Sequence, residues 1–211
     1  MNRETITALI MAKNEEKNIP GCLENIKWCD EIVVVDDMSV DNTAAICRDV
    51  GAKVFQYKSN GDYNAQTDIG LANITSDWVL SMDADERVTP ELKADILKVL
   101  AGHSRFSAYR FMRRNHFLGR WMRYGGWYER QTKLFRRGNA RYADKSNLGQ
   151  LKVEGETGAL NTYINHYPFN SISQFIDRQI NYAIFEAKVM YEKKGKLSLD
   201  EIKYNLTKRP L

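Results

Sequence analysis

The chain has 211 residues, of which 43% are hydrophobic and 27% are charged, a composition typical of a globular protein and unlike that of a disordered or collagen-like chain. No uncharged apolar stretch approaches the roughly 20 residues that a membrane-spanning helix needs, and the polar N-terminus predicts no signal peptide. Three cysteines without C-x-x-C spacing argue against structural zinc and disulfide bonds and favour a reducing cytoplasm.

Basic residues are concentrated in one segment. Between Arg105 and Lys145, twelve Lys and Arg residues stand against Glu129 and Asp144, a local charge of +10 in a chain whose net charge is +4. Ten aromatic residues lie in the same segment. Such a segment favours an anionic partner, and three explanations stay open: binding of a diphosphate, docking on anionic lipid, or a solvated surface.

Strand and helix signals alternate over the first hundred residues, which predicts a parallel α/β sheet. Short apolar runs rich in β-branched residues predict strands over residues 5–11, 31–35, 52–57 and 77–82. Apolar residues at helical spacing predict helices over residues 14–27, from Ser39 or Asp41 to Val50, over residues 62–74, and after an N-terminal cap at Thr89.

The pattern changes beyond Gly102. Alternating residues predict strands over residues 106–113 and 131–136, joined by a loop rich in glycine and aromatic residues. A long amphipathic helix is expected from Ser171 or Ser173 to Lys193, followed by a polar helix over residues 197–211. We therefore expect an α/β domain over residues 1–165 and a helical C-terminal extension over residues 166–211.

Two of the predicted strands end in acidic residues, Asp36 and Asp37 after the second and Asp83 and Asp85 after the fourth. Because the carboxyl ends of parallel strands lie along one edge of a sheet, these side chains should converge on one crevice. Crowded carboxylates need compensating charge, and Mg²⁺ or Mn²⁺ bridging the phosphates of a ligand is the simplest compensation. The alternative is that the aspartates only form turns and that Glu86 only adds negative charge at a helix N-terminus.

Three blocks, TALIMAKNEEKNI, EIVVVDDMSVDNT and DWVLSMDADERVTPEL, resemble in order and spacing the pattern of glycosyltransferase family 2. The later segments RRNHFLGRWMRYGGWYERQTKLFRRG and HYPFNSISQFIDR resemble the branch of this family that adds sugars to bacterial lipopolysaccharide core, capsule and other surface glycans. The resemblance covers nearly the whole chain. It implies a GT-A-type, Rossmann-like α/β fold with a mostly parallel sheet flanked by helices.

The resemblance also implies roles for individual residues. Asp85 would hold the metal ion, Mn²⁺ or Mg²⁺, with Asp83 nearby. The residues expected to bind the nucleotide are Ala12, Asn14, Glu15, Asp36, Asp37, Gln66 and Asp83. The residues expected on the acceptor or phosphate side are Gln131, Lys133, Arg136 and His166.

Two positions depart from the family pattern. The usual Q-[RK]-N begins at Gln66 but continues with Thr67, which removes a cation that would face the phosphates. The V-H-E that many relatives carry is replaced by Asn147-Leu148-Gly149, so a natural general base is missing there. Glu129 is our candidate for the base; the alternatives are another acid in its place, weak activity, or an active partner elsewhere.

The sequence thus predicts a metal-dependent, inverting, hexosyltransferase-like enzyme that moves a sugar from a nucleotide-diphosphate donor, with a UDP-sugar expected. The acceptor would be a glycan or a lipid-linked glycan of the bacterial surface. We expect a cytoplasmic protein with peripheral contact on the inner face of the cell membrane, and no nucleic-acid partner, since the acidic crevice repels a polyanion. The alternative is a catalytically silent GT-A module that binds a nucleotide or a partner protein.

Overall fold

The structure is a computed structural model that describes residues 3–59, 63–102, 104–124, 127–142, 151–169 and 171–194. The predicted helix over residues 197–211 and the segment Asn147-Leu148-Gly149 lie outside the described residues. The chain divides into two units, Met1–Pro168 and Phe169–Leu211.

Four parallel strands form the first half of the main sheet. Their order is β3-β2-β1-β4, and their bounds are Ile6–Ala12 (β1), Glu31–Asp36 (β2), Lys53–Gln56 (β3) and Trp78–Asp83 (β4). The apolar runs of β1, β2 and β4 are what strands covered on both faces require. The predicted strands agree with these bounds to within one residue at each end.

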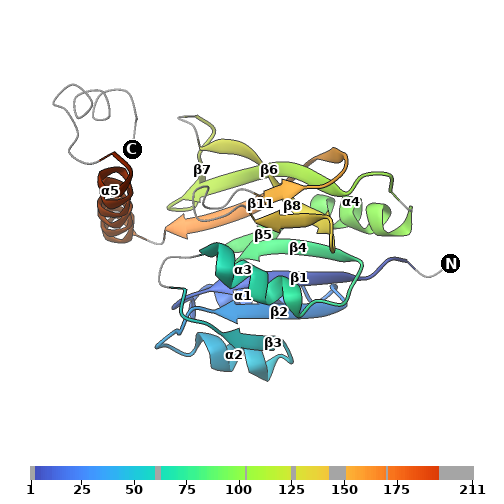
Figure 1. The fold of residues 1–211 in the computed structure, drawn as a ribbon, viewed down its shortest axis with the longest axis horizontal. Helices are drawn as coiled ribbons and strands as arrows, with labels where there is room; N and C mark the ends of the chain where they lie inside the picture. Colours follow the sequence, from blue (N-terminus) through green and yellow to red (C-terminus); the bar gives the residue numbers. More distant parts are fainter. Residues whose placement is uncertain are drawn as a thin grey trace. The chain divides into compact units, whose positions relative to one another are not determined.

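Helices cover both faces of these strands. Their bounds are Ile19–Asn25 (α1), Thr43–Asp49 (α2), Tyr63–Ala72 (α3) and Pro90–Ala101 (α4). One hydrophobic core joins β1 to α1, α2 and α4, and a second core on the other face joins β1 and β2 to α3, which Figure 1 shows lying across the strands. Thr89 caps α4 as predicted, because its hydroxyl accepts a hydrogen bond from the N–H of Leu92 (3.2 Å).

The first helix begins later in the chain than predicted, because of the loop that follows β1. The sequence predicts a helix from residue 14, but α1 begins at Ile19, because Asn14 has a left-handed backbone (φ 54°) and its N–H donates to the Ser39 hydroxyl (2.8 Å). Neither Ser39 nor Asp41 is the N-cap of α2, because the helix begins at Thr43 and Asn42 occupies the cap position without a side-chain cap hydrogen bond. Asp41 lies one residue further out and accepts a hydrogen bond from the N–H of Thr43 (3.0 Å). The hydrogen bond between Asn14 and Ser39 thus joins the loop after β1 to the loop after β2.

Antiparallel strands extend the sheet beyond β4. The order continues β4-β8-β6-β11-β5, with β7 beside β6. The bounds are Glu86–Val88 (β5), Ala108–Phe117 (β6), Arg120–Trp121 (β7), Tyr128–Arg136 (β8) and Thr157–Phe169 (β11), and a separate hairpin pairs Ala140–Tyr142 (β9) with Leu151–Val153 (β10). The α/β architecture is confirmed, but within the described residues parallel pairing is limited to the first four strands. No crossover helix joins β6 to β8, so these strands pair antiparallel.

The strand β11 was not predicted from the sequence. It runs for 13 residues and passes through the expected domain boundary between residues 165 and 166, so His166 belongs to the sheet rather than to a helical extension. The first unit correspondingly continues to Pro168.

The sheet curls so that its last strand returns to β4. β5 starts at Glu86, three residues after Asp83 ends β4, yet β5 stands at the far end of the strand order. Because three residues span at most about 11 Å, the end of β4 and the start of β5 lie close together. The strands between them, β8, β6 and β11, therefore surround a small interior, and the charged residues described below project into it.

In its described part, the second unit consists mainly of the helix α5, Ile172–Lys194. Ser171 accepts a hydrogen bond from the N–H of Gln174 (3.1 Å), so of the two predicted starting serines it is Ser171 that caps the helix. Among the described helices, none is long and apolar enough to cross a membrane.

Arg136 lies at the end of β8 that is remote from the acidic edge. The strand register pairs it with Trp78, the first residue of β4, whereas Asp83 is the last residue, about 16 Å along the strand. Its guanidinium forms an ion pair with Glu4 (2.7 Å) and stacks on the Trp78 ring (4.6 Å). The structure therefore contradicts the expectation that Arg136 lies on the acceptor or phosphate side; it holds the N-terminal segment to the sheet instead.

The substitution Arg136→Gln is expected to lower the free energy of unfolding by about 1–2 kcal/mol, because it removes an ion pair and a cation–π contact. Urea denaturation at neutral pH measures this loss. A matched control is Arg105→Gln, which also removes an ion pair, with Glu156 (3.7 Å), and a contact with an aromatic ring, that of Phe106 (4.8 Å), but from an exposed side chain that should contribute little. Reduced binding of a nucleotide by Arg136→Gln would contradict the position assigned to Arg136.

The same pair predicts a pH dependence. Burial opposes ionisation of Glu4, but its hydrogen bonds with Arg136 and Trp78 outweigh burial and hold its pKa below the ordinary value. A carboxyl group with a lowered pKa stabilises the fold above its unfolded-state pKa, and this contribution is lost as the pH falls through the folded-state pKa. The stability difference between wild type and Arg136→Gln should therefore shrink in acid.

Candidate active site

The predicted aspartates lie along one edge of the parallel strands. Asp36 pairs with Ala12 at the end of β1, and Asp83 pairs with the preceding residue of β1 from the other side. Two strand spacings, about 10 Å, separate these two positions. Asp37 directly follows Asp36, and Asp85 comes two residues after Asp83, so the structure brings the four residues to a common rim.

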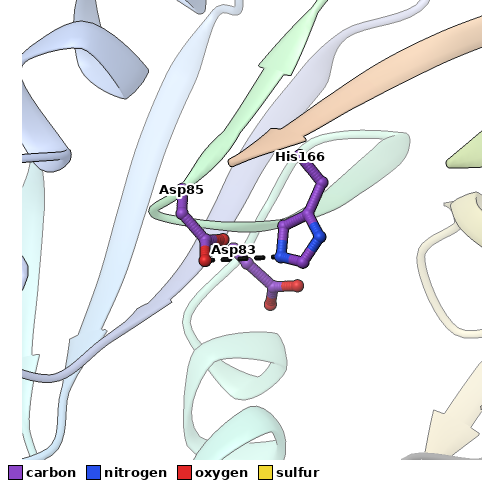
Figure 2. A group of neighbouring side chains, drawn as sticks. All are labelled: Asp83, Asp85 and His166. Atoms are coloured by element: carbon purple, nitrogen blue, oxygen red, sulfur yellow. Dashed lines mark ion pairs between the residues drawn. The ribbon is translucent and has the colours of Figure 1, made fainter. Parts of the chain in front are cut away.

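Asp83, Asp85 and His166 form the tightest part of this rim. One ligand atom of each lies within 4.8 Å of the others, and Asp85 Oδ2 is 3.3 Å from His166 Nε2. Figure 2 shows the three side chains turned toward a common space, with the aspartates near the end of β4 and the histidine on β11. Strand pairing fixes this arrangement, since His166 pairs with Glu86 and the N–H of Tyr167 donates to the Asp85 carbonyl (2.9 Å). Two carboxylates and an imidazole suit a divalent cation such as Mn²⁺.

Buried charges of both signs lie beneath these three residues. Glu86 is completely buried, and its carboxylate is 2.7 Å from Lys133 Nζ, which is also 3.3 Å from Asp83 Oδ2. Arg113 lies 3.7 Å from Glu86 and 3.9 Å from Asp83. Lys133, expected on the acceptor or phosphate side, is thus a charge partner of the acidic residues.

The two cations decide the ionisation of Asp83. Burial opposes its ionisation, but the positive charges of Lys133 and Arg113 outweigh burial, and its pKa lies below the ordinary value. Burial dominates at Glu86, and its pKa is raised. Burial also disfavours the charged form of Lys133, but Asp83 and Glu86 prevail and raise its pKa. The cluster therefore keeps Asp83 negatively charged and Lys133 positively charged.

Hydrogen bonds to the backbone hold the turn between β4 and β5. Glu86 Oε2 accepts from the N–H of Asp83 (3.0 Å). The Arg87 guanidinium donates to two carbonyl oxygens of the turn (2.9 and 2.7 Å) and to that of Asn18 before α1 (2.7 Å). Gly21 leaves room for this guanidinium, since a Cβ atom there would lie 2.8 Å from Arg87 Nη2. The turn that carries Asp85 is thereby fixed from two sides.

Asp37 links the loops at the end of the rim that follows β2. Its Oδ2 accepts from Lys13 Nζ (2.9 Å) and the Ser59 hydroxyl (2.8 Å), and its Oδ1 accepts from the N–H of Ser59 (2.9 Å). Burial opposes ionisation of Asp37, but these hydrogen bonds prevail and lower its pKa. Asn14 joins the loops again, because its Oδ1 accepts from the N–H of Val40 (2.9 Å). The loops after β1, β2 and β3 thus form one connected wall, here called the loop wall (residues 13–16, 37–43 and 57–59).

The other predicted nucleotide residues differ in their access to a ligand. Asp36 is completely buried, and its Oδ2 accepts from the Gln56 amide (3.1 Å) and from a backbone N–H of the following loop. Gln66 is buried and donates to a carbonyl of β2 (2.9 Å), and Ala12 is also buried. Asn14 is exposed and Glu15 is half-buried. Asp36 and Gln66 therefore support the rim from beneath, while Asn14 and Glu15 lie on it.

The strand β8 carries three of the predicted residues. Gln131 Oε1 accepts from Arg113 Nη1 (3.3 Å), next to the contacts of Lys133. Because strand residues alternate between faces, position 129 shares the face of position 131, and the register pairs Glu129 with Arg113. The side chain of Glu129 lies outside the described part of the structure.

Three residues of the site received no such role from the sequence: Glu86, Arg113 and Asn115. Glu86 has the local pattern of a helix N-terminal charge, and its burial arises only from the curl of the sheet. Asn115 lies 2.6 Å from His166 through Oδ1 and Nδ1, and it is buried. The predicted strand ended at Arg113, whereas β6 continues to Phe117; the two-residue spacing of Arg113 and Asn115 was the signal that could have placed both on one face.

Comparisons with known proteins agree with the motifs. Residues 7–161 match the family model "Glycosyl transferase family 2". The chain is 30% identical to a protein of Rickettsia felis named "Uncharacterized glycosyltransferase", over 92% of this chain and 73% of that protein. It is 33% identical to the lipopolysaccharide core biosynthesis glycosyltransferase LpsC of Rhizobium meliloti, over 71% of this chain and 56% of that protein.

One similar solved structure is glucosyl-3-phosphoglycerate synthase from Mycobacterium tuberculosis in complex with Mn²⁺, UDP-glucose and phosphoglyceric acid. The TM-score is 0.44 at 22% sequence identity, and the match covers 53% of this chain and 44% of that chain. This chain thus spans less than half of the solved protein. The family match over residues 7–161 and the similarity to the Rickettsia felis protein show that the chain belongs to glycosyl transferase family 2, with the GT-A-type α/β fold that its motifs predict.

Proposed function

We propose that this chain is an inverting glycosyltransferase that moves a sugar from a nucleotide-diphosphate donor, a UDP-sugar, to a glycan or lipid-linked acceptor of the bacterial surface. The observation that carries the proposal is the convergence of Asp83, Asp85 and His166 at the end of β4, on the same rim as Asp37. The name of the Rhizobium meliloti relative, a lipopolysaccharide core biosynthesis glycosyltransferase, supports the acceptor class.

Mn²⁺ is the proposed ion, with Mg²⁺ as the alternative. Mg²⁺ favours oxygen ligands, whereas Mn²⁺ also accepts the imidazole nitrogen that His166 offers beside the two carboxylates. Asp85 and His166 are each 6% exposed, while the Asp83 side chain is 43% exposed, so two ligands would be held firmly and the third would face the donor. The bound ion would neutralise the charge of the diphosphate leaving group.

The remaining steps, binding of the nucleoside and deprotonation of the acceptor, are assigned to residues of the loop wall and of β8. Asn14, Glu15 and Asp37 of the loop wall would hold the nucleoside. The acceptor hydroxyl would attack the anomeric carbon of the sugar while the bond from that carbon to the diphosphate oxygen breaks, which inverts the configuration. Glu129 would take the proton of the hydroxyl. Its pairing with Arg113, whose guanidinium contacts the site residues, supports this assignment.

We also propose that the helix α5 makes the peripheral contact with the inner face of the cell membrane. Four isoleucines at four-residue spacing are each about half exposed, and they are Ile172, Ile176, Ile180 and Ile184. Residues at this spacing lie on one side of a helix, and an exposed apolar stripe is typical of an interfacial helix.

The substitution Asp85→Asn is expected to weaken the Mn²⁺-dependent binding of UDP by at least about tenfold. Replacing a residue that only orients a metal ligand already weakens metal binding by about that factor, and Asp85 is proposed to be a ligand itself. Titration calorimetry with UDP, in Mn²⁺ and in chelator, measures the affinity. Asp49→Asn, at the exposed end of α2, is the matched control and should bind as wild type does. Equal UDP affinity of the wild-type protein in Mn²⁺ and in chelator would contradict the metal site.

The substitution Glu129→Gln is expected to lower kcat about 10²–10⁴-fold, because it removes the general base, and to leave UDP binding unchanged. Release of UDP from a set of UDP-sugars, with lipopolysaccharide-core acceptors, measures turnover. Glu24→Gln on the exposed side of α1 is the control. If the wild-type protein binds UDP with Mn²⁺ but turns over none of these donors, the silent module suggested by Asn147-Leu148-Gly149 replaces the enzyme.

A further inference from the structure

The dipeptide Asn-His occurs twice, as Asn115-His116 on β6 and as Asn165-His166 on the neighbouring strand β11. Each asparagine contacts the histidine of the other strand: Asn115 Oδ1 lies 2.6 Å from His166 Nδ1, and Asn165 Oδ1 lies 3.3 Å from His116 Nε2. Because strand residues alternate, the two pairs lie on opposite faces of the sheet. One pair includes the histidine of the proposed metal site, while in the other His116 stacks on Tyr167 (4.7 Å).

The orientation of the Asn115 amide is fixed by two further contacts. Its Nδ2 donates to the carbonyl oxygen of Trp127 (2.6 Å), which can only accept. Its Oδ1 accepts from Arg113 Nε (3.3 Å), which can only donate. The oxygen of the amide therefore faces His166, and the short contact requires that His166 Nδ1 carries a hydrogen atom.

The other nitrogen of the ring consequently faces the aspartates. His166 Nε2 lies 3.3 Å from Asp85 Oδ2, and in the neutral ring with a hydrogen on Nδ1 it is Nε2 that carries the lone pair. Arg113 Nη2 lies 2.9 Å from His166 Nδ1 and 3.0 Å from Nε2, so this contact does not distinguish the two nitrogens, and the tautomer is assigned from the Asn115 amide alone. A metal ion binds the unprotonated nitrogen of a histidine, so the hydrogen bond at Nδ1 selects the nitrogen that is available for it.

We propose that Asn115 is a positioning residue that fixes the ring orientation and the Nδ1–H tautomer of His166, so that Nε2 is presented to the divalent cation. The presentation of Nε2 to a cation rests on the proposed function. The tautomer of His166 does not, because contacts within the protein set it. Asn115 is 9% exposed, so water competes little for the contact.

The experiment compares three variants of the full chain. Asn115→Leu removes both the acceptor for His166 and the donor for Trp127. Asn115→Asp keeps an acceptor for His166, removes the donor for Trp127 and adds a negative charge beside Arg113. Asn165→Leu, in the matched pair on the opposite face, is the control. Circular dichroism and thermal melting verify that each variant is folded.

The first measurement is the ¹⁵N NMR spectrum of the imidazole rings in metal-free protein at alkaline pH, where an ordinary histidine is neutral. The chain has three histidines, so single substitutions assign the signals. The wild type, Asn115→Asp and Asn165→Leu are expected to show His166 with its hydrogen on Nδ1. Asn115→Leu is expected to shift His166 toward the Nε2–H tautomer.

The second measurement is Mn²⁺ binding, followed by the electron paramagnetic resonance of the free ion. Asn115→Leu is expected to bind Mn²⁺ about 10–100-fold more weakly, while Asn115→Asp and Asn165→Leu keep the wild-type affinity within a few-fold. If Asn115→Asp loses as much affinity as Asn115→Leu, the contact with Trp127 matters and the proposed role is overturned.

The tautomer separates this inference from the proposed function. A hydrogen on Nε2 in the wild type, or a tautomer that Asn115→Leu leaves unchanged, overturns the role of Asn115 even if Mn²⁺ binds. If the wild type shows the Nδ1–H tautomer and Asn115→Leu loses it, but the protein binds no Mn²⁺, the positioning of His166 by Asn115 is supported and the metal site is contradicted.

Discussion

The site depends on the compensation of buried negative charge at the end of β4. Glu86 is completely buried directly after the two aspartates, and a carboxylate in such a position is costly unless a cation and hydrogen bonds offset its desolvation. Lys133 and Arg113 supply the charge, and the backbone N–H of Asp83 supplies a hydrogen bond. β8 pairs directly with β4, whereas Glu86 begins β5 at the other end of the strand order, so Lys133 of β8 can contact Glu86 only because the sheet curls. The compensation of the buried charge therefore depends on the curl of the sheet.

Two different kinds of contact hold the two sides of this rim in place. On the side of β2, hydrogen bonds join the loops after β1, β2 and β3 into the loop wall, and Asp37 is bonded to two of them. On the side of β4, strand pairing and the Arg87 guanidinium hold the turn after this strand. Both groups of contacts are made within the protein, so under the proposed function the geometry of the rim would largely be formed before a donor binds. Such preorganisation is what electrostatic stabilisation of a leaving group requires.

The sequence predicts the parallel half of the fold well and the antiparallel half poorly. The strands β1 to β4 are short runs of buried apolar residues, and periodicity and length suffice to find them. β5 has only three residues, and β11 mixes asparagine, threonine, histidine and tyrosine on both faces, so neither has an apolar pattern. The lack of a clear pattern in the antiparallel half also explains where the prediction of the site was wrong. Arg136 is bound far from the rim by a strand register that the sequence does not specify, and Asn115 lies beyond the predicted end of its strand.

The central claim is that Asp83, Asp85 and His166 together hold a divalent cation that binds a nucleoside diphosphate. Anomalous diffraction at the manganese absorption edge, from crystals grown with Mn²⁺ and UDP, tests it most directly. The account predicts a single strong peak between the oxygen atoms of Asp83 and Asp85 and His166 Nε2, in contact with the diphosphate. Density for UDP along the rim without manganese at these three residues, or manganese bound elsewhere, would contradict it.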